Sequence, residues 1–273
     1  MTNTPDRYAV IGNPIAHSKS PEIHLRFAAQ TQQQMMYERL LSPLDAFAVT
    51  VRDFVQGGGK GLNVTVPFKL EAHALATILT ERARMAGAVN TLKFDGDQIL
   101  GDNTDGVGLV NDILHNAKRE IGGKSVLLLG AGGAARGVLL PLLEQRPVCL
   151  TLANRTTEKA QTLAQSFAGR GRIEVSDFAA LDSPFDLIIN ATAASMSAQA
   201  LPLSPRLFAA HTLAYDMMYG QNPTVFMQFA AAQGAKVRDG LGMLVEQAAE
   251  SFFVWRNMRP DTSTVFADLR ARV

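Results

Sequence analysis

Short apolar runs alternate along the chain with longer segments of helical character. Residues 125–129 form a nearly continuous apolar run, which is typical of a parallel strand buried on both faces. Residues 241–255 carry apolar side chains three and four positions apart, which is the spacing of an amphipathic helix. Strands that alternate with helices in this way predict an α/β fold with a doubly wound sheet.

The same pattern predicts elements over most of the chain. We expect strands at residues 7–11, 62–66, 89–94, 98–100, 125–129, 148–153, 187–190 and 213–217. We expect helices at residues 133–144, 156–167, 224–233 and 241–255, a short one after Pro260, and others that begin at Ser20 and at Thr104 or Asp105. Ser20 before Pro21 is typical of a helix N-cap, and Asp95-Gly96 between two strands is typical of a hairpin turn.

Composition and charge narrow the class of partner. The 273 residues allow one or two domains, and 47% of them are apolar. The 26 Lys and Arg residues balance 25 Asp and Glu residues, and a formal net charge of +1 excludes a broad basic surface for nucleic acid or anionic lipid. We therefore expect small-molecule partners, no nucleic acid and no membrane.

The single cysteine and the N-terminal residues indicate the cellular compartment of the protein, and the histidines indicate whether it binds a metal ion. A single cysteine excludes a disulfide framework, and residues 1–7 lack the pattern of a secretory signal. Both features favour the cytoplasm. The five histidines lack metal-ligand spacing, so we expect no metal site.

A glycine-rich turn joins the predicted strand at 125–129 to the predicted helix at 133–144. Its sequence, Gly130-Ala131-Gly132-Gly133-Ala134-Ala135, fits the G-x-G-x-x-G/A pattern. Gly130 permits the tight turn, Gly132 lets a pyrophosphate approach the backbone, and Ala135 lets the helix pack closely on the sheet. Because the helix N-terminus then faces the anion, the turn predicts a dinucleotide site.

The end of the next strand bears on which dinucleotide binds. An NAD site usually carries an acidic residue there for the ribose 2′-hydroxyl, but this chain reads Asn154-Arg155-Thr156-Thr157-Glu158-Lys159. Arg155 and Lys159 are cations suited to a 2′-phosphate, and Thr156 can donate a hydrogen bond. The alternative is that Thr156 caps a helix and Arg155 is a solvated surface charge. The missing acid and the added cations favour NADP over NAD.

Polar clusters outside this turn are ambiguous when each is taken alone. Ser18 and Ser20 lie at a predicted helix N-terminus, which suits a carboxylate, but Ser20 as a plain cap is an equal alternative. Thr65 shares one face of a predicted strand with Asn63, and Lys69 follows the end of that strand. A lone lysine there would most often be solvated.

Motifs in order along the chain resemble those of the shikimate dehydrogenase family. They are Val10–Pro21, Asn63–Lys69, Gly87–Thr91, Gly101–Gly106, Gly130–Ala135, Asn154–Thr156, Tyr215–Tyr219 and Asp239–Val245. The resemblance implies NADP-dependent interconversion of shikimate and 3-dehydroshikimate, a step of aromatic amino-acid biosynthesis. It also implies two domains: a substrate domain of residues 1–105 with 240–273, and a Rossmann-type NADP-binding domain of residues 106–239.

The resemblance further implies a role for each site residue. The substrate carboxylate is held by Ser18, Ser20 and Tyr219, and the ring hydroxyls by Thr65, Lys69, Asn90, Asp105 and Gln247. The proposed acid/base position falls on Lys69, beside Asp105. The cofactor positions are Gly130, Ala131, Gly132, Gly133, Ala134, Asn154, Arg155, Thr156, Lys159, Met217, Gly240 and Glu81.

The chemistry leaves two roles open for Lys69. A lysine must be desolvated to act as a base at neutral pH, whereas a nearby Asp105 favours the charged ammonium. We therefore give oxyanion stabilisation and proton donation by Lys69 at least as much weight as free-base action.

Alternatives to this function, and the state of association, stay open. One is a quinate/shikimate dehydrogenase with relaxed cofactor use, and another is a noncatalytic NADP-binding sensor, which would not need both Lys69 and Asp105. We expect a monomer or a homodimer. Ala193 and Ser195 stand where the family usually has Ser and Gly, which puts the geometry of that loop in question.

Overall fold

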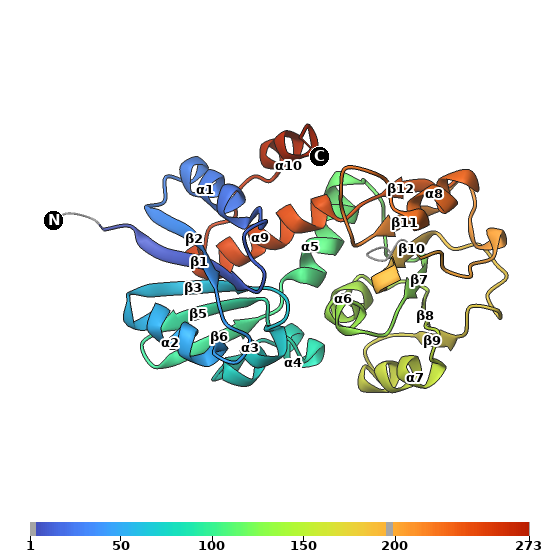
Figure 1. The fold of residues 1–273 in the computed structure, drawn as a ribbon. Coiled ribbons are helices and arrows are strands. Elements are labelled where there is room, and N and C mark those ends of the chain that lie inside the picture. The colour runs from blue at the N-terminus through green and yellow to red at the C-terminus, as the bar shows by residue number, and fades with distance from the viewer. Residues whose placement is uncertain (1–3, 195–198, 273) are drawn as a thin grey trace. The chain divides into compact units, whose positions relative to one another are not determined.

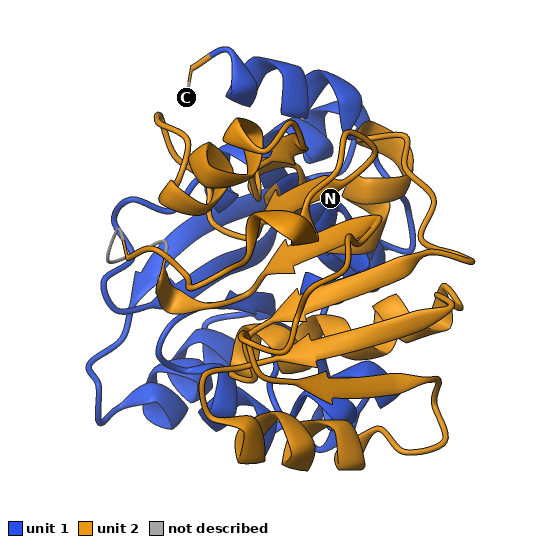
Figure 2. Ribbon diagram, turned by 90° about the vertical axis from the view of Figure 1, so that its right-hand side faces the viewer, with its two compact units in different colours: residues 1–108, 245–271 blue, residues 109–244, 272–273 orange. Residues whose placement is uncertain are grey.

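The computed structural model describes residues 4–194 and 199–272. Ser195, one of the two departures from the family pattern, lies outside the described residues. The chain divides into two compact units, which Figure 2 colours separately. Unit 1 consists of residues 1–108 and 245–271, and unit 2 consists of residues 109–244 and 272–273.

Unit 1 is built on a mixed six-stranded sheet in the order β2-β1-β3-β5-β6-β4. β1 pairs in parallel with β2 and β3, β5 is antiparallel to β3 and β6, and β4 pairs in parallel with β6. The strands are β1 (Asp6–Gly12), β2 (Met35–Leu41), β3 (Gly59–Val64), β4 (Ile78–Leu79), β5 (Thr91–Asp95) and β6 (Gln98–Asp102). The helices are α1 (Ser20–Gln30), α2 (Phe47–Gln56), α3 (Lys69–Leu75), α4 (Glu81–Ala86), most of α9 (Leu241–Arg256) and α10 (Ser263–Arg270).

Alternate residues of β1 face the two sides of this sheet. Ala9 and Ile11 join the apolar core that α2 and α3 cover. Tyr8 faces the other side, where its ring centroid lies 4.8 Å from that of Trp255 on α9. Trp255 also donates from Nε1 to the carbonyl of Leu92 at 2.9 Å. Figure 1 shows α2 and α3 on one side of the sheet and α1 and α9 on the other, so the last long helix of the chain completes unit 1.

Unit 2 is built on a parallel six-stranded sheet in the order β12-β11-β10-β7-β8-β9. This is the strand order of dinucleotide-binding folds, with the direction of winding reversed between β7 and β10. The strands are β7 (Ser125–Leu129), β8 (Cys149–Ala153), β9 (Ile173–Ser176), β10 (Leu187–Asn190), β11 (Leu213–Asp216) and β12 (Lys236–Arg238). The helices are α5 (Asp105–Asn111), which begins in unit 1, a π-helical turn (Asp112–Asn116), α6 (Gly133–Glu144), α7 (Thr157–Ser166), a 3-10 turn (Pro205–Leu207) and α8 (Val225–Ala232).

The doubly wound sheet and several of its elements are confirmed. β7 and α6 have the predicted bounds, because a buried apolar run and a glycine turn mark them clearly. The hairpin between β5 and β6 also forms, with Gly96 at φ 57° and Asp95 paired with Gln98. Glycine adopts this left-handed conformation without the steric cost of a side chain.

Two local predictions are wrong. Ser20 is not the N-cap of α1 but its first residue, since the helix is preceded by Lys19 and the Ser20 N–H donates to Ser18 Oγ at 3.3 Å. The strand predicted to reach residue 66 ends at Val64, because the Phe68 N–H bonds the Thr65 carbonyl at 3.0 Å and turns the chain toward α3. Thr65 therefore lies in a turn, and the argument from strand alternation does not apply to it.

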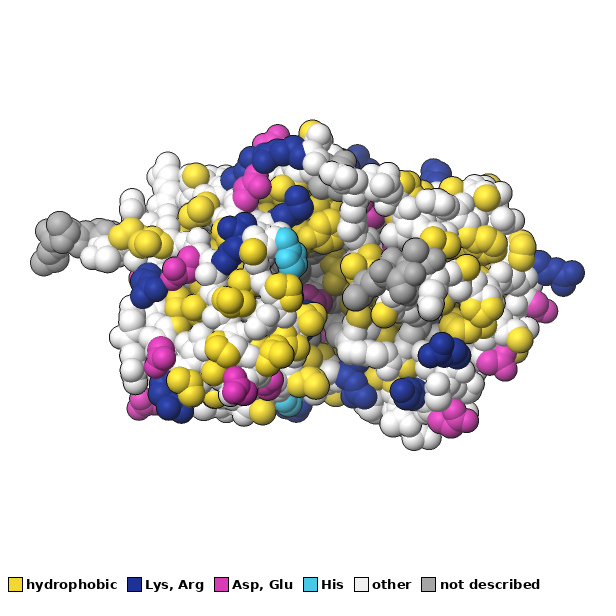
Figure 3. Space-filling model, in the orientation of Figure 1, with side chains coloured by type: hydrophobic (Ala, Val, Ile, Leu, Met, Phe, Trp, Pro, Cys, Tyr) yellow, Lys and Arg dark blue, Asp and Glu magenta, His cyan; other side chains and the backbone are white. Residues whose placement is uncertain are grey.

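Charged side chains are dispersed over the face shown in Figure 3, where dark blue and magenta groups lie side by side without a broad area of one sign. Within residues 4–194 and 199–272, no helix has both the length and the apolar character needed to cross a membrane. The described side chains also include no group of three or more His, Cys, Asp or Glu arranged for a metal ion.

Candidate active site

The two residues predicted to carry acid/base chemistry form an ion pair in unit 1. Lys69 is the first residue of α3 and Asp105 the first of α5, and Lys69 Nζ lies 2.5 Å from Asp105 Oδ2. Their side chains are 31% and 21% exposed, so a small molecule can reach both. Lys69 is thus not a solvated surface lysine, because its ammonium is paired with the carboxylate of Asp105.

The side-chain amide of Asn90 has a fixed orientation beside this pair. Its Oδ1 accepts a hydrogen bond from the backbone N–H of Thr104 at 2.9 Å, and a backbone N–H can only donate. The amino group of Asn90 therefore faces Asp105 and donates to Oδ1 at 2.8 Å. Both oxygens of Asp105 are acceptors, one for Lys69 and one for Asn90.

Gln247 reaches the same cluster from α9. Its Oε1 lies 3.4 Å from Asn90 Nδ2 and 3.4 Å from Thr104 Oγ1. α9 approaches closely because Gly108 on α5 has no side chain, and a Cβ there would lie 2.6 Å from Gln247 Cβ. The structure thus brings Gln247 close to Asn90. Two residues that bind the same substrate must lie close together in this way.

The serines predicted to bind a carboxylate lie together at the start of α1. Ser18 Oγ and Ser20 Oγ are 3.2 Å apart, with Ser18 half-buried and Ser20 buried. Thr65 follows β3, where its backbone N–H donates to the Ile11 carbonyl at 3.0 Å. Within residues 4–194 and 199–272, no hydrogen bond joins these three side chains to Lys69. Their roles toward the substrate therefore stay predictions.

The glycine turn of unit 2 has the geometry that a pyrophosphate needs. Gly130 follows β7 at φ 109°, and a Cβ there would lie 3.2 Å from the carbonyl oxygen of Ala191, beyond β10. Gly132 is the N-cap of α6 without a side-chain cap, and open space lies where a Cβ of Gly132 or Gly133 would stand. Uncapped N–H groups beside open space, at the point where the strand order reverses, fit a dinucleotide. Ala131 lies in the same turn, and Ala134 is the second residue of α6.

The residues predicted to read the 2′-phosphate surround the start of α7. Arg155, Thr156 and Lys159 are all exposed or partly exposed, and neither cation forms an ion pair with another residue of the described ranges. Thr156 is the N-cap of α7, yet its side chain makes no capping hydrogen bond. Asn154 Nδ2 donates to the Thr156 carbonyl at 2.8 Å and holds this corner. Two unpaired cations and an uncommitted hydroxyl fit a phosphate group.

A buried carboxylate holds the segment after β11. Asp216 Oδ1 accepts from the Met218 N–H at 3.0 Å, and Oδ2 accepts from the Thr224 hydroxyl at 2.6 Å. Gly240 packs directly on this segment, because a Cβ there would lie 2.1 Å from the Met217 carbonyl oxygen. The structure brings Met217 and Gly240 into contact, and their role toward a nicotinamide remains a prediction.

Tyr219 and Glu81 complete the predicted set. Tyr219 is half-buried in unit 2, and burial raises the pKa of its phenol, so the hydroxyl keeps its proton and can donate to a carboxylate. Glu81 is exposed at the start of α4 in unit 1, whereas the glycine turn belongs to unit 2. Its cofactor role stays an expectation from resemblance.

Sequence reasoning missed several residues that shape these sites. Asp216 is an acid at the end of an apolar strand, and its position could have indicated a buried structural role. Gly108 gives no signal in the sequence, because its contact with Gln247 exists only once α9 is placed on α5. Ser251, one turn beyond Gln247, reads as an ordinary helix residue although it is fully buried.

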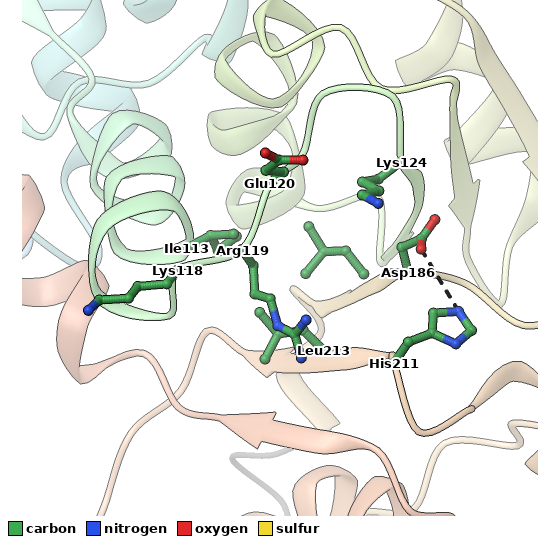
Figure 4. Close-up of a pocket in the computed structure, with 9 residues that line it drawn as sticks. Ile113, Lys118, Arg119, Glu120, Lys124, Asp186, His211 and Leu213 are labelled. Carbon is green, nitrogen blue, oxygen red and sulfur yellow. Dashed lines mark ion pairs between the residues drawn. The ribbon is translucent and has the colours of Figure 1, made fainter.

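A cavity of about 310 Å³ opens at the amino ends of strands in the unit 2 sheet, opposite the end at which the glycine turn follows β7. It is lined near the amino ends of β7, β10 and β11 by residues that include Lys124 and Leu213. Figure 4 shows His211 beside Asp186, with a nitrogen-to-oxygen distance of 3.8 Å. No predicted site residue lines this cavity, and ligands of such sheets bind at the carboxyl ends of the strands.

Comparison with known proteins reveals relatives over the full length of the chain. Sequence models described as Shikimate dehydrogenase substrate binding domain, Shikimate / quinate 5-dehydrogenase and Shikimate 5'-dehydrogenase C-terminal domain match residues 10–92, 112–199 and 240–265. The chain is 71% identical over 273 residues to a protein of Herminiimonas arsenicoxydans named shikimate dehydrogenase (NADP(+)). That alignment covers 100% of both chains.

Solved structures share the fold. An enzyme from Pseudomonas putida named Ael1 superposes with a TM-score of 0.94 at 46% identity, over 97% of this chain and 98% of that chain. Shikimate 5-dehydrogenase from Thermus thermophilus, solved in complex with NADP(H) and shikimate, superposes with a TM-score of 0.86 at 31% identity, over 98% and 100%. The predicted two-domain α/β fold is confirmed, and the chain belongs to the shikimate dehydrogenase family.

Proposed function

We infer that this chain catalyses the reversible, NADPH-dependent reduction of 3-dehydroshikimate to shikimate, a step of chorismate and aromatic amino-acid biosynthesis. The observation that carries this function is the pair of Lys69 and Asp105, held by Asn90 in a half-buried site. The relative of 71% identity is named for this activity with NADP(+). A noncatalytic sensor would have no use for such a pair.

In this proposal Lys69 exchanges a proton with the reacting oxygen of the substrate. Its ammonium donates to the substrate carbonyl and offsets the negative charge that develops there during reduction. The proton on Nζ then moves to that oxygen, and in the oxidative direction Lys69 takes it back. Asp105 accepts from Nζ at 2.5 Å and so orients the ammonium, while Asn90 fixes the carboxylate.

Other side chains hold the substrate in this proposal. Ser18, Ser20 and Tyr219 bind its carboxylate, supported by the two adjacent hydroxyls at the start of α1 and by the protonated phenol. The ring hydroxyls contact Thr65, Lys69, Asn90, Asp105 and Gln247. Each of these residues carries polar atoms that can exchange hydrogen bonds with a hydroxyl.

NADPH supplies the hydride when it is bound. Gly130, Ala131, Gly132, Gly133 and Ala134 would hold its pyrophosphate, supported by the open space over the N-terminus of α6. Arg155, Thr156 and Lys159 would hold its 2′-phosphate, with Asn154 bonded to the Thr156 carbonyl at the same corner. Met217 and Gly240 would contact the nicotinamide, and Glu81 would contribute to cofactor binding, as the resemblance implies.

The domain borders, compartment and association state complete the proposal. Residues 1–105 with 240–273 bind substrate, and residues 106–239 bind NADP. Both borders lie in or next to α5 and α9, the two helices that carry the chain between the compact units. A single cysteine favours the cytoplasm. Light scattering after size exclusion distinguishes a monomer from a homodimer.

One assay tests the activity and its nearest alternative. Oxidation of quinate is a second candidate, because the model matched by residues 112–199 is described as Shikimate / quinate 5-dehydrogenase. Purified protein is given shikimate or quinate, each with NADP and with NAD, and absorbance of the reduced cofactor is followed. Turnover of shikimate with NADP is expected to dominate. Efficient use of quinate with NAD favours the second candidate, and no turnover with any pair rejects both.

A further inference from the structure

We propose that three buried hydroxyls, those of Thr91, Thr104 and Ser251, position Asn90 and Gln247 for the reaction, and we call them the hydroxyl triad. All three residues are fully buried, with 0% exposure. They are positioning residues, because they act on the substrate through Asn90 and Gln247. This inference rests on the proposed function of the same site.

The triad joins three elements at one point. Thr91 begins β5, Thr104 precedes α5, and Ser251 belongs to α9. Ser251 Oγ lies 2.8 Å from Thr91 Oγ1 and 3.1 Å from Thr104 Oγ1. It also lies 3.0 Å from the carbonyl oxygen of Gln247, one turn earlier on the same helix. One hydroxyl of α9 therefore contacts both threonines and the backbone that carries Gln247.

The triad also holds both ends of the Asn90 amide. Thr91 Oγ1 donates to Asn90 Oδ1 at 2.9 Å, and Thr104 Oγ1 lies 3.1 Å from the same atom. Thr104 Oγ1 further accepts from Asn90 Nδ2 at 3.0 Å and lies 3.4 Å from Gln247 Oε1. Together with the backbone N–H of Thr104, which fixes which end of the amide accepts, these contacts hold the Asn90 amino group toward Asp105.

The side chain of Asn63 on β3 supplies a further hydrogen bond to the hydroxyl triad. Its Nδ2 donates to Ser251 Oγ at 2.9 Å, and its Oδ1 accepts from the hydroxyl of Tyr37 at 2.7 Å. Because Asn63 donates to it, Ser251 has its single proton left for a threonine or for the Gln247 carbonyl. The proton directions in the cluster therefore depend on one another, and a change at one member reaches the others.

Loss of one hydroxyl leaves its buried partners without a hydrogen bond, which is costly. A shift of the Asn90 or Gln247 side chain would recover a partner, and a shift of Asn90 would also move its amino group away from Asp105. Small displacements of this kind are known to lower rates by about 10²-fold when they misplace reacting groups. The triad should therefore affect the turnover of substrate more than the folding of the chain.

Thr104 offers an isosteric test. Thr104→Val keeps the shape and removes the hydroxyl, whereas Thr104→Ser keeps the hydroxyl. We expect Thr104→Val and Ser251→Ala to lower kcat/KM for shikimate by about tenfold or more, and Thr104→Ser to remain about tenfold more active than Thr104→Val. Equal kcat/KM in the two Thr104 variants overturns the proposal.

Ser42→Ala is the matched control for burial. Ser42 is also 0% exposed in unit 1, and its hydroxyl bonds Thr50 at 3.1 Å, outside the triad. We expect Ser42→Ala to keep kcat/KM within about threefold of the wild type, because its partners are not placed around Asn90. Equal losses in Ser42→Ala and Ser251→Ala would mean that any buried hydroxyl has this effect, and would overturn the proposal. The dissociation constant for NADPH, measured without shikimate, should change less than about twofold in every variant, because the glycine turn belongs to unit 2.

A readout independent of activity separates this inference from the proposed function. The side-chain amide signal of Asn90 in nitrogen–proton spectra is identified by its loss in Asn90→Asp. In the unliganded protein that signal should shift in Thr104→Val and Ser251→Ala and stay in place in Ser42→Ala. An unshifted signal in both triad variants overturns the positioning role. A wild-type protein that fails to oxidise shikimate would instead reject the proposed function, and the shifts would still decide the role of the triad.

Discussion

At the scale of single residues, we expect the reaction to depend most on the side chain of Lys69, whose Nζ lies 2.5 Å from Asp105 Oδ2. Lys69→Ala is expected to lower kcat by about 10²–10⁴, because proton transfer and charge stabilisation are lost together. Steady-state kinetics with shikimate and NADP measures the effect, with the exposed Lys60 of β3 changed to alanine as the control. A near-normal kcat with only a raised KM would reduce Lys69 to a binding residue.

We expect the choice between NADP and NAD also to depend on single side chains. Arg155→Ala should raise the KM for NADP far more than the KM for NAD, by roughly tenfold or more, because only NADP carries the 2′-phosphate that a guanidinium pairs with. Arg206, an exposed arginine of the same unit, gives a control variant of equal charge change. Equal effects of Arg155→Ala on both cofactors would mean that this residue does not read the phosphate.

At the scale of elements, the contact of α5 with α9 brings Gln247 close to Asn90. A Cβ at Gly108 would lie 2.6 Å from Gln247 Cβ and 2.7 Å from its backbone nitrogen, so Gly108→Ala must push the two helices apart. We expect kcat/KM for shikimate to fall by about tenfold or more and the free energy of unfolding to fall by about 1–3 kcal/mol.

Gly61→Ala serves as the control for crowding alone. A Cβ at Gly61 would lie 2.4 Å from Trp255 Nε1, farther along α9 than Gln247. This variant should lose similar stability in urea titrations and keep kcat/KM within about threefold of the wild type. If both glycine variants lower kcat/KM equally, general loosening of α9 explains the effect, and Gly108 has no specific role toward Gln247.

Elements differ in how far the sequence reveals them, and packing explains the difference. β7 and α6 could be predicted to the residue, because the strand is buried on both faces and Gly130 ends it. β2 escaped prediction because it is an edge strand, with exposed residues that break the alternation. The edge strands β9 and β12 are short and contain no buried residue, and α3 and α4 have seven and six residues, too few for a clear helical period.

The candidate site also has features that the sequence reveals and features that only packing reveals. The residue types of Lys69 and Asp105 could be singled out because their motifs resemble a family. Their pairing could not be derived from spacing, since it needs the starts of α3 and α5 to meet. The hydroxyl triad was missed for a similar reason, because Ser251 approaches Thr91 and Thr104 only after α9 has packed on the sheet.

At the scale of the whole molecule, the net charge of +1 means that cations and carboxylates nearly balance. Many are paired within the fold, such as Arg82 with Asp102 and Arg238 with Asp112, whose carboxylates are buried. Arg155 and Lys159 are exposed and form no ion pair among residues 4–194 and 199–272. A protein that recognises small anions locally needs only such a few unpaired cations and no surface of one sign.

The stability of the molecule should depend on pH through a buried histidine. His24 is 0% exposed, its ring stacks on that of Tyr37 at 4.4 Å, and neither ring nitrogen has a hydrogen-bond partner among the described residues. Burial lowers the pKa of His24 to about 3. Burial is the larger cause, and the neighbouring Asn63 acts on this pKa in the opposite direction.

The sign of the effect follows from proton uptake. Between pH 6.5 and about 3 the unfolded chain binds a proton on His24 that the folded chain does not, so acid favours unfolding. The stabilisation that His24 provides as a neutral side chain is fully present above pH 6.5. The free energy of unfolding should fall by about 1.4 kcal/mol per pH unit between pH 6.5 and about 3. Urea unfolding at a series of pH values should give a shallower acid slope for His24→Leu than for the wild type, whatever the absolute loss of packing. His115→Gln, at an exposed histidine, should keep the wild-type slope. Parallel slopes in His24→Leu and the wild type would mean that other groups, chiefly carboxylates, account for the acid sensitivity.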